Sequence, residues 1–206
     1  MNRSGRRVTN VRTYIYSNPI CSFTSTYRLR FPLFLEQYST SVEPYSIDEV
    51  FLDFPFMSYE KAELLARHIK QRLLREIGVQ ARIGIGPTKV YAKMACDHFA
   101  KENKTGTAVL CDANVSEQLW PLPIKKLFSV GSRMEAHLLN MGIRTIGQLA
   151  RYPLQDLKKR WGINGELLWQ TAHGRDGSPV SSDTHQKRKS IGHHMTLPVT
   201  ITTGQR

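Results

Sequence analysis

The chain has 206 residues, 40% hydrophobic and 22% charged, a composition that can bury a core in one or two domains and excludes disorder throughout. The 29 Lys and Arg outnumber the 17 Asp and Glu, so the formal net charge of +12 favours a polyanion, either nucleic acid or an anionic membrane. Cys21, Cys96 and Cys111 lack zinc-ligand or disulfide spacing, and no stretch has the length of a signal peptide or membrane span. We therefore expect an unsecreted, cytoplasmic protein without a membrane partner.

No helix or strand is predicted for the first 35 residues, because polar residues alternate with short apolar runs and two prolines interrupt any helical period. The run YSIDEVFLDF, residues 45–54, is rich in aromatic and β-branched residues. With Pro44 before it and Pro55 after it, this run predicts a strand or a tight hairpin.

The next segment predicts an amphipathic helix that ends at Gly78, since apolar residues recur there at every fourth position: Leu65, Ile69, Leu73 and Ile77. Residues 79–85 then alternate apolar with polar, the period of a strand, and Thr88 can cap a helix that runs to about Phe99. This order of strand, helix, strand and helix indicates a sheet covered by helices, an α/β or α+β architecture.

Residues 115–177 predict a small all-helical domain with short turns. The signals for its helix ends are capping boxes at Ser132/Glu135 and Thr145/Gln148, Pro153 in a first turn, Asn164 as an N-cap, and Gly142 and Gly174 as terminators.

The segment after the helical domain predicts a basic linker, residues 178–190, because it is polar and cationic without periodicity. Residues 191–206 predict a single strand. Since a stable sheet needs partner strands, we expect this strand to open a C-terminal domain that has been cut off.

The adjacent carboxylates Asp48 and Glu49 are candidate metal ligands, because Mg²⁺ and Mn²⁺ prefer hard oxygen donors of this kind. Neighbours in a regular strand face opposite ways, so both can reach one ion only if the backbone turns there, as a hairpin allows. Taken alone, an Asp-Glu pair is more often a pair of exposed charges at a turn. The surrounding sequence must decide between these interpretations.

That surrounding sequence resembles the Y-family (translesion) DNA polymerases, bacterial polymerase IV or V. YSIDEVFLD, residues 45–53, is similar to the family's second catalytic motif, whose core is Ser-x-Asp-Glu. Residues 82–106 are similar to its palm strand and helix, residues 127–150 to its helix-hairpin-helix thumb, and residues 189–198 to the opening strand of its little-finger domain. The resemblance implies an α+β fold, with a partial palm at residues 36–114 followed by the all-helical thumb, after an N-terminal segment, residues 1–35, that does not match.

The resemblance also implies roles for particular residues and partners. Asp48 and Glu49 match the catalytic ligands of the two divalent ions, Mg²⁺ or Mn²⁺, whereas Asp53 matches no ligand. Lys101 matches the lysine that contacts the incoming deoxynucleoside triphosphate, with Lys104 as a rival. The implied partner is primer-template DNA, damaged DNA included; the usual docking region for the family's sliding clamp is absent from the sequence.

Two clusters are expected to contact DNA phosphates. Gly131, Ser132 and Arg133 open a thumb helix, where backbone N–H groups and the positive helix end can face a phosphate. The second cluster is cationic and lies in the linker: Lys187, Arg188 and Lys189. Without the resemblance, an ordinary helix start and solvated linker charges are the simpler interpretations.

The family's first motif, a strand whose Asp bridges both ions, should lie well upstream of Ser46, but only 45 residues precede Ser46 and none of residues 1–47 is Asp. We therefore expect a truncated, misread or divergent start and a chain that does not polymerise by itself. Two alternatives stay open: a noncatalytic DNA-binding module that uses the helix-hairpin-helix and the basic linker, and a metal-dependent nuclease, for which no motif is present.

Overall fold

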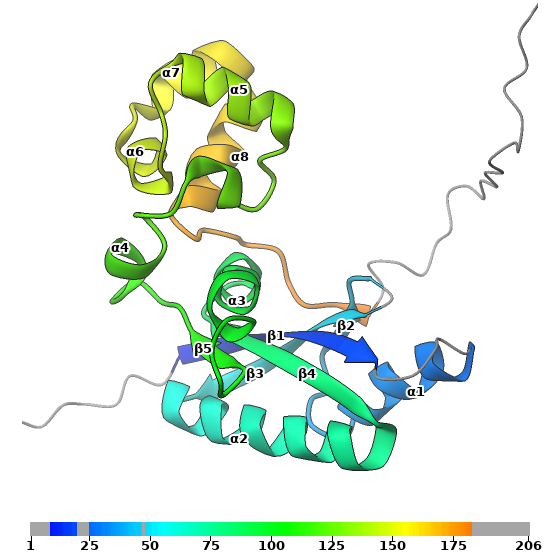
Figure 1. Cartoon of the computed structure of the whole chain (residues 1–206). Coiled ribbons are helices and arrows are strands. Elements are labelled where there is room, and N and C mark those ends of the chain that lie inside the picture. The colour runs from blue at the N-terminus through cyan, green and yellow to red at the C-terminus, as the bar shows by residue number, and fades with distance from the viewer. Residues whose placement is uncertain (1–8, 20–24, 47, 183–206) are drawn as a thin grey trace, which may run out of the picture.

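The fold combines a five-stranded mixed sheet with a bundle of short helices, as the computed structural model shows for residues 9–19, 25–46 and 48–182 (Figure 1). The sheet order is β2-β3-β1-β4-β5; β1 is antiparallel to both of its neighbours, and β5 is parallel to β4. The strands are β1 (Thr9–Pro19), β2 (Val42–Pro44), β3 (Glu49–Met57), β4 (Val79–Gly86) and β5 (Thr107–Val109). The expected α+β class is confirmed.

The central strand β1 comes from the segment for which no element was predicted. Val11, Tyr14 and Ile15 are fully buried, and the polar Thr13 and Ser17 are also buried. A strand that is covered on both faces lacks the apolar-polar alternation that marks a half-exposed strand, so its pattern is difficult to recognise.

One face of the sheet is covered by α1 (Ser25–Leu35) and α2 (Tyr59–Arg72) (Figure 1). Helix α1 contains Pro32, which was expected to interrupt any helix in this segment. The helix forms nevertheless, and Phe31, Phe34 and Leu35 pack into the core under the sheet. Helix α2 begins at the N-cap Ser58 and continues through a π-helical turn, Leu73–Ile77, to Gly78, where its amphipathic pattern predicts the end. Gly78 has φ +74°, a conformation that favours glycine.

The other face is covered by α3 (Lys89–Ala95), which continues as a π-helical turn, Cys96–Ala100. Thr88 caps α3 by accepting a hydrogen bond from the Tyr91 N–H at 3.2 Å, as predicted. The helix lies very close to β4, as Gly84 shows: a Cβ at this position would lie 2.0 Å from the Ala92 carbonyl oxygen. This contact fixes the height of α3 above the sheet.

The hairpin predicted between Pro44 and Pro55 is formed by β2 and β3, but β3 runs past Pro55 to Met57. The pairing of β1 with β3 is irregular between Thr9 and Val11, opposite the proline. A proline cannot donate to a sheet ladder, so an irregularity at this position accommodates it.

The helical region contains α4 (Val115–Gln118), a 3₁₀ turn (Ile124–Lys126), α5 (Ser132–Asn140), α6 (Ile146–Arg151), α7 (Leu154–Trp161) and α8 (Ile163–Ala172). The capping box at Thr145 and Gln148 is confirmed. The prediction for Ser132 is wrong, since Gly131 is the N-cap of α5. Pro153 precedes α7, and Asn164 lies inside α8, whose N-cap is Gly162. None of the helices among the described residues is long and apolar enough to cross a membrane.

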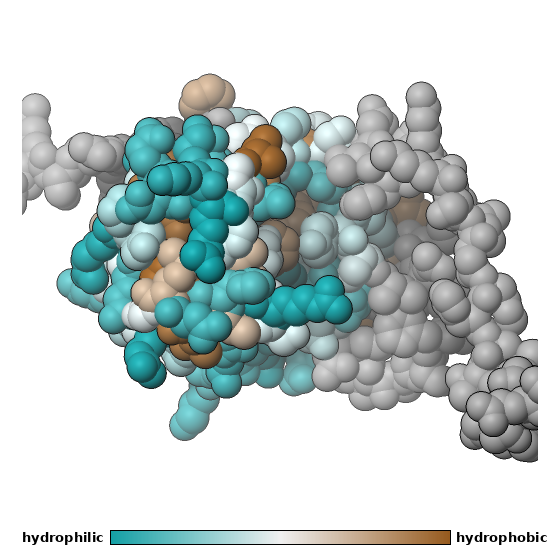
Figure 2. All heavy atoms as spheres, turned by 90° about the horizontal axis from the view of Figure 1, so that it is seen from above, coloured by the Kyte–Doolittle hydropathy of each residue, from teal (hydrophilic) through white to brown (hydrophobic). Residues whose placement is uncertain are grey.

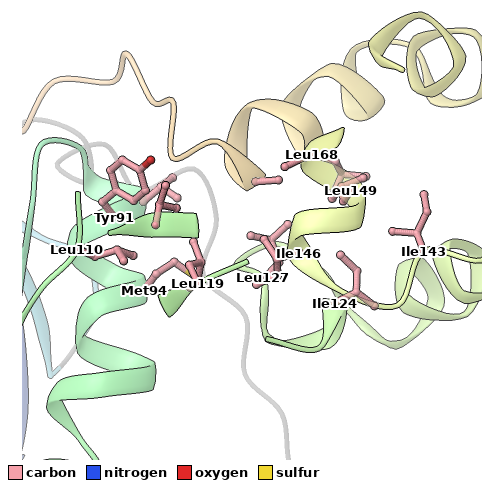
Figure 3. Close-up of a cluster of buried hydrophobic side chains, with 14 of the residues drawn as sticks. Tyr91, Met94, Leu110, Leu119, Ile124, Leu127, Ile143, Ile146, Leu149 and Leu168 are labelled. Carbon is pink, nitrogen blue, oxygen red and sulfur yellow. The ribbon is translucent and has the colours of Figure 1, made fainter. Parts of the chain in front are cut away.

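One hydrophobic cluster joins the helical region to α3, as Figure 3 shows. Tyr91 and Met94 of α3 lie at one end of this cluster, and Leu127, Ile146 and Leu168 belong to the helical region. The two regions therefore share a core.

Candidate functional site

The candidate metal ligands Asp48 and Glu49 lie in the turn between β2 and β3 and at the start of β3. The turn is fixed from both sides: the Ser17 N–H of β1 donates to the Asp48 carbonyl oxygen at 2.9 Å, and the Tyr45 N–H donates to the Glu49 carbonyl oxygen at 2.8 Å. The Asp48 carboxylate accepts a hydrogen bond from the Ser46 hydroxyl at 2.7 Å. The serine of the motif thus orients the first carboxylate.

The Glu49 carboxylate faces α3 and forms an ion pair there. Lys93 Nζ lies 3.1 Å from Glu49 Oε1 and 3.5 Å from Asp97 Oδ2, and it donates a hydrogen bond to the Tyr14 hydroxyl. Burial, followed by the hydrogen bond and charge of Glu49, raises the pKa of Tyr14. Tyr14 therefore stays protonated beside the carboxylate.

Lys101, the candidate triphosphate contact, lies at the end of the same helical segment. Its Nζ pairs with Asp97 Oδ1 at 2.7 Å and lies 3.9 Å from the centre of the Tyr16 ring. Tyr16 is the β1 residue directly opposite Glu49. Burial alone lowers the pKa of Lys101, but the hydrogen bond and charge of Asp97 raise it. Glu49 and Lys101 thus lie on the same face of the sheet, linked through Asp97 and Lys93. The rival Lys104, exposed like Lys101, lies in the following turn.

The donor chemistry of Asp48 and Glu49 fits one hard divalent ion, but not an assembled two-ion centre. Among the described residues, no group of three or more His, Cys, Asp or Glu side chains could hold a metal ion. The strand β1 presents Tyr14 and Tyr16, and no carboxylate, to this site.

Sequence reasoning missed the polar network around Glu49, which is formed by Lys93, Asp97 and Tyr14. A signal was present, because Lys89, Lys93, Asp97 and Lys101 recur at every fourth position of a helix that is otherwise largely buried. Such spacing places charges on one side of a helix. The tyrosine could not be identified in this way, since it belongs to the unpredicted strand β1.

The candidate phosphate-binding residues of the helical region are exposed at the start of α5. Gly131, Ser132 and Arg133 border a surface hollow together with Met134, His137 and Trp161. Residues 115–177 contain nine Lys and Arg and five Asp and Glu, so the region carries a positive balance. Figure 2 shows mainly hydrophilic side chains on this end of the molecule. Lys187, Arg188, Lys189 and the strand expected in residues 191–206 lie outside the described residues.

A cavity of about 400 Å³ lies between the sheet region and the helical region, and Tyr45, Lys89, Lys93 and Phe128 are among the residues that line it. The segment after α8 also lines the cavity, and it returns to the sheet, where the Ser181 N–H donates to Glu43 Oε2 at 3.0 Å. Glu43 is only 3% exposed and also pairs with Lys89 Nζ at 2.5 Å. The cavity is thus bordered by three parts of the chain.

Two family models match the chain. Residues 17–97 match the impB/mucB/samB family, and residues 125–176 match the thumb domain of DNA polymerase iota. Together the two matched stretches make up more than half of the chain. The first match begins inside β1 and includes Asp48, Glu49 and Lys93 but not Lys101.

The chain is 52% identical over 172 residues to DNA polymerase IV 2 of Bacillus subtilis, an alignment that covers 82% of this chain and 42% of the relative. The chain therefore spans less than half of that relative's length. Among solved structures, DinB from Sulfolobus solfataricus is 26% identical with a TM-score of 0.65, covering 75% of this chain and 46% of that one. An insertion ternary complex of Dbh DNA polymerase is 25% identical with a TM-score of 0.64, covering 75% and 45%.

Proposed function

We propose, from the premise that the chain belongs to the Y family of DNA polymerases, that it is the palm and thumb part of a translesion polymerase and binds primer-template DNA. The observation that carries this proposal is the Ser-x-Asp-Glu hairpin, held by β1 on the face of the sheet that also carries Lys101. The sheet region corresponds to the palm and the helical region to the thumb. In the intact enzyme, the reaction would be template-directed transfer of a nucleotide to a primer, past damaged bases among others.

The roles follow from the chemistry of each side chain. Asp48 and Glu49 would hold Mg²⁺ or Mn²⁺, whose positive charge, once bound, offsets charge on the nucleotide phosphates. Lys101, at an exposed helix end, would provide a point charge for the triphosphate. Ser46 orients Asp48 by donating a hydrogen bond to it.

The thumb would hold DNA through backbone phosphates. At the start of α5, the exposed N–H groups of Gly131 and Ser132 and the Arg133 guanidinium offer donors and charge for one phosphate. Such contacts fix position without reading sequence. The linker cations Lys187, Arg188 and Lys189 would add charge along the same DNA.

We further propose that this chain by itself does not extend a primer. The support is local: β1 presents tyrosines rather than a carboxylate opposite the hairpin, and Glu49 is already paired with Lys93. A two-ion reaction needs more ligands than Asp48 and Glu49 supply. In a primer-extension assay on a lesion-containing template with Mg²⁺ or Mn²⁺, we expect no incorporation; incorporation that Asp48→Ala abolishes would contradict this expectation.

DNA binding is tested separately by fluorescence anisotropy with a labelled primer-template duplex. Arg133→Ala should weaken binding severalfold and reduce the slope of log K against log salt concentration by about 1, as loss of one phosphate contact does. Arg67→Ala is the matched control, because Arg67 is an exposed arginine of α2, away from the thumb. Equal effects of the two substitutions would show that only general charge attracts DNA.

The second candidate function, a noncatalytic DNA-binding module, is favoured by the ion pair that occupies Glu49. Calorimetric titration with Mn²⁺ separates the two. Binding that disappears in Asp48→Ala, with duplex binding intact, supports a polymerase metal site. Duplex binding without any Mn²⁺ binding supports the module.

A further inference from the structure

Lys93 is a buried ammonium in the middle of the palm site. Its residue is 9% exposed, and its side chain reaches from α3 to β1 and β3. A buried charge requires partners that replace water. In the described part of the chain, Lys93 Nζ finds two carboxylates, Glu49 and Asp97, and the hydroxyl of Tyr14.

Aromatic rings complete the surroundings of this ammonium. The Nζ atom lies 4.3 Å from the centre of the Tyr14 ring, 5.2 Å from that of Tyr45 and 5.8 Å from that of Phe128. Ring faces attract cations at such distances. Carboxylate oxygens at 3.1 and 3.5 Å and aromatic rings further out form a site that suits one positive charge, and Lys93 supplies that charge from within the chain.

We propose that Lys93 is an internal cation that holds Glu49 and competes with a divalent metal ion for it. The inference rests on the proposed function, because it takes Glu49 to be a metal ligand. An ammonium 3.1 Å from Glu49 Oε1 neutralises the charge that attracts a metal ion. It also repels a second cation at short range. Metal binding is therefore weakened as long as Glu49 stays paired with Lys93, and Lys93 acts as a positioning residue that sets metal affinity.

Removing this charge would uncover a latent metal site. Glu49, Asp97 and the Tyr14 hydroxyl, which now converge on the ammonium, would be left around the space it fills. Carboxylate oxygens, which Glu49 and Asp97 supply here, are the ligands that Mg²⁺ and Mn²⁺ prefer. Methionine is one heavy atom shorter than lysine and suits the aromatic surroundings. Lys93→Met therefore removes the charge and vacates the position of Nζ, while the rest of the side chain still fills its place.

The test measures Mn²⁺ binding to the full chain by calorimetry and by electron paramagnetic resonance of the free ion, without DNA or turnover. Lys93→Met should bind Mn²⁺ at least roughly tenfold more tightly than the natural chain, a coupling within the usual range for interacting sites. The gain should disappear in the double variant Lys93→Met, Glu49→Gln. Lys93→Arg, which keeps the charge, should show no gain.

Lys89→Met is the matched control, because Lys89 lies one turn earlier on the same helix, with the same 11% side-chain exposure, and pairs with the buried Glu43. It tests whether losing any buried ion pair changes metal affinity, and no gain is expected. Thermal unfolding identifies variants that do not fold; Lys93→Gln replaces Lys93→Met if the latter fails.

The outcomes separate the inference from the proposed function. If the natural chain binds Mn²⁺ through Asp48 and the Lys93 variants bind it equally or more weakly, the competition is disproved and the function stands. If neither the natural chain nor the Lys93 variants bind Mn²⁺, both the competition and the metal site are disproved. If Lys89→Met gains as much as Lys93→Met, the effect is not specific to Lys93 and the inference fails.

Discussion

At the scale of single residues, Cys96 shows how closely α3 lies on the sheet. Its thiol is fully buried, and burial, followed by the charge of Asp97, raises the pKa of Cys96 to about 12. The reactive form of a cysteine is the thiolate, so Cys96 should be inert in the folded chain at pH 8. The half-buried Cys111 is more accessible.

We therefore expect iodoacetamide at pH 8 to label Cys111 well before Cys96. Peptide mass spectrometry after timed labelling would give the two rates, and labelling in urea would show that both thiols react once the chain unfolds. Equal rates in the folded chain would mean that α3 does not stay packed against β4.

The candidate site could be predicted only where its residues are close in sequence. Asp48 and Glu49 are adjacent within a recognisable motif, and Lys101 follows a matched strand and helix. The pairing of Lys93 with Glu49 spans 44 residues and depends on how α3 crosses the sheet. Tyr14 lies on a strand that has no recognisable pattern, so its contact with Lys93 could not be predicted from the sequence.

At the scale of elements, the close contact between β4 and α3 is possible because Gly84 has no side chain. A Cβ there would lie 2.0 Å from the Ala92 carbonyl oxygen and 2.4 Å from the Cys96 nitrogen, and backbone atoms cannot move aside singly. Gly84→Ala should lower the free energy of unfolding by about 1–3 kcal/mol or more, as overpacking does. Urea unfolding followed by circular dichroism would measure the loss.

Gly177→Ala is the control, since nothing lies within 4 Å of a Cβ at that position. It should change the free energy of unfolding by no more than about 0.5 kcal/mol. A similar loss for both glycines would indicate a general effect of glycine replacement rather than a clash with α3.

The elements that could be predicted are those with a clear period or clear end signals, such as α2 and β4. Helix α1 was missed because Pro32 argues against a helix locally, whereas Phe31, Phe34 and Leu35 pack into the core and outweigh that preference. The start of α5 was misplaced by one residue, since Gly131 takes the cap that Ser132 could have provided. Tertiary contacts decided the case of α1, whereas Gly131 and Ser132 are neighbours of residue types that both occur at N-caps.

At the scale of the whole molecule, Tyr91 joins palm and thumb. Its ring packs in the shared hydrophobic cluster, and its hydroxyl lies 2.8 Å from Asp112 Oδ1 and 3.0 Å from the His173 carbonyl oxygen. Because of this common core, we expect the two regions to unfold in one cooperative transition. The placement of the two regions relative to each other could not be predicted from the sequence, since it depends on long-range contacts such as the one between the Tyr91 hydroxyl and the His173 carbonyl oxygen.

Tyr91→Ala should destabilise the chain by about 3–5 kcal/mol, as loss of a buried aromatic ring does, and separate the two regions into distinct transitions in calorimetry. Tyr91→Phe, which keeps the ring and loses only the hydroxyl, should cost about 1 kcal/mol and leave one transition. A single, unshifted transition for Tyr91→Ala would disprove the role of the ring in joining the two regions.

The segment after α8 is fastened at both ends, and this limits how the thumb can move. At one end the Thr88 hydroxyl donates to the Gly174 carbonyl oxygen at 2.7 Å; at the other, Ser181 is held by Glu43 and Val180 is buried. With the connection through residues 110–115, the thumb has two tethers to the palm (Figure 1). Rotation of the thumb about the line between these two points would also pull apart the shared hydrophobic cluster around Tyr91. We therefore expect the cavity over Lys93 to keep one width, and a single pair of fluorescent labels on palm and thumb should report one distance.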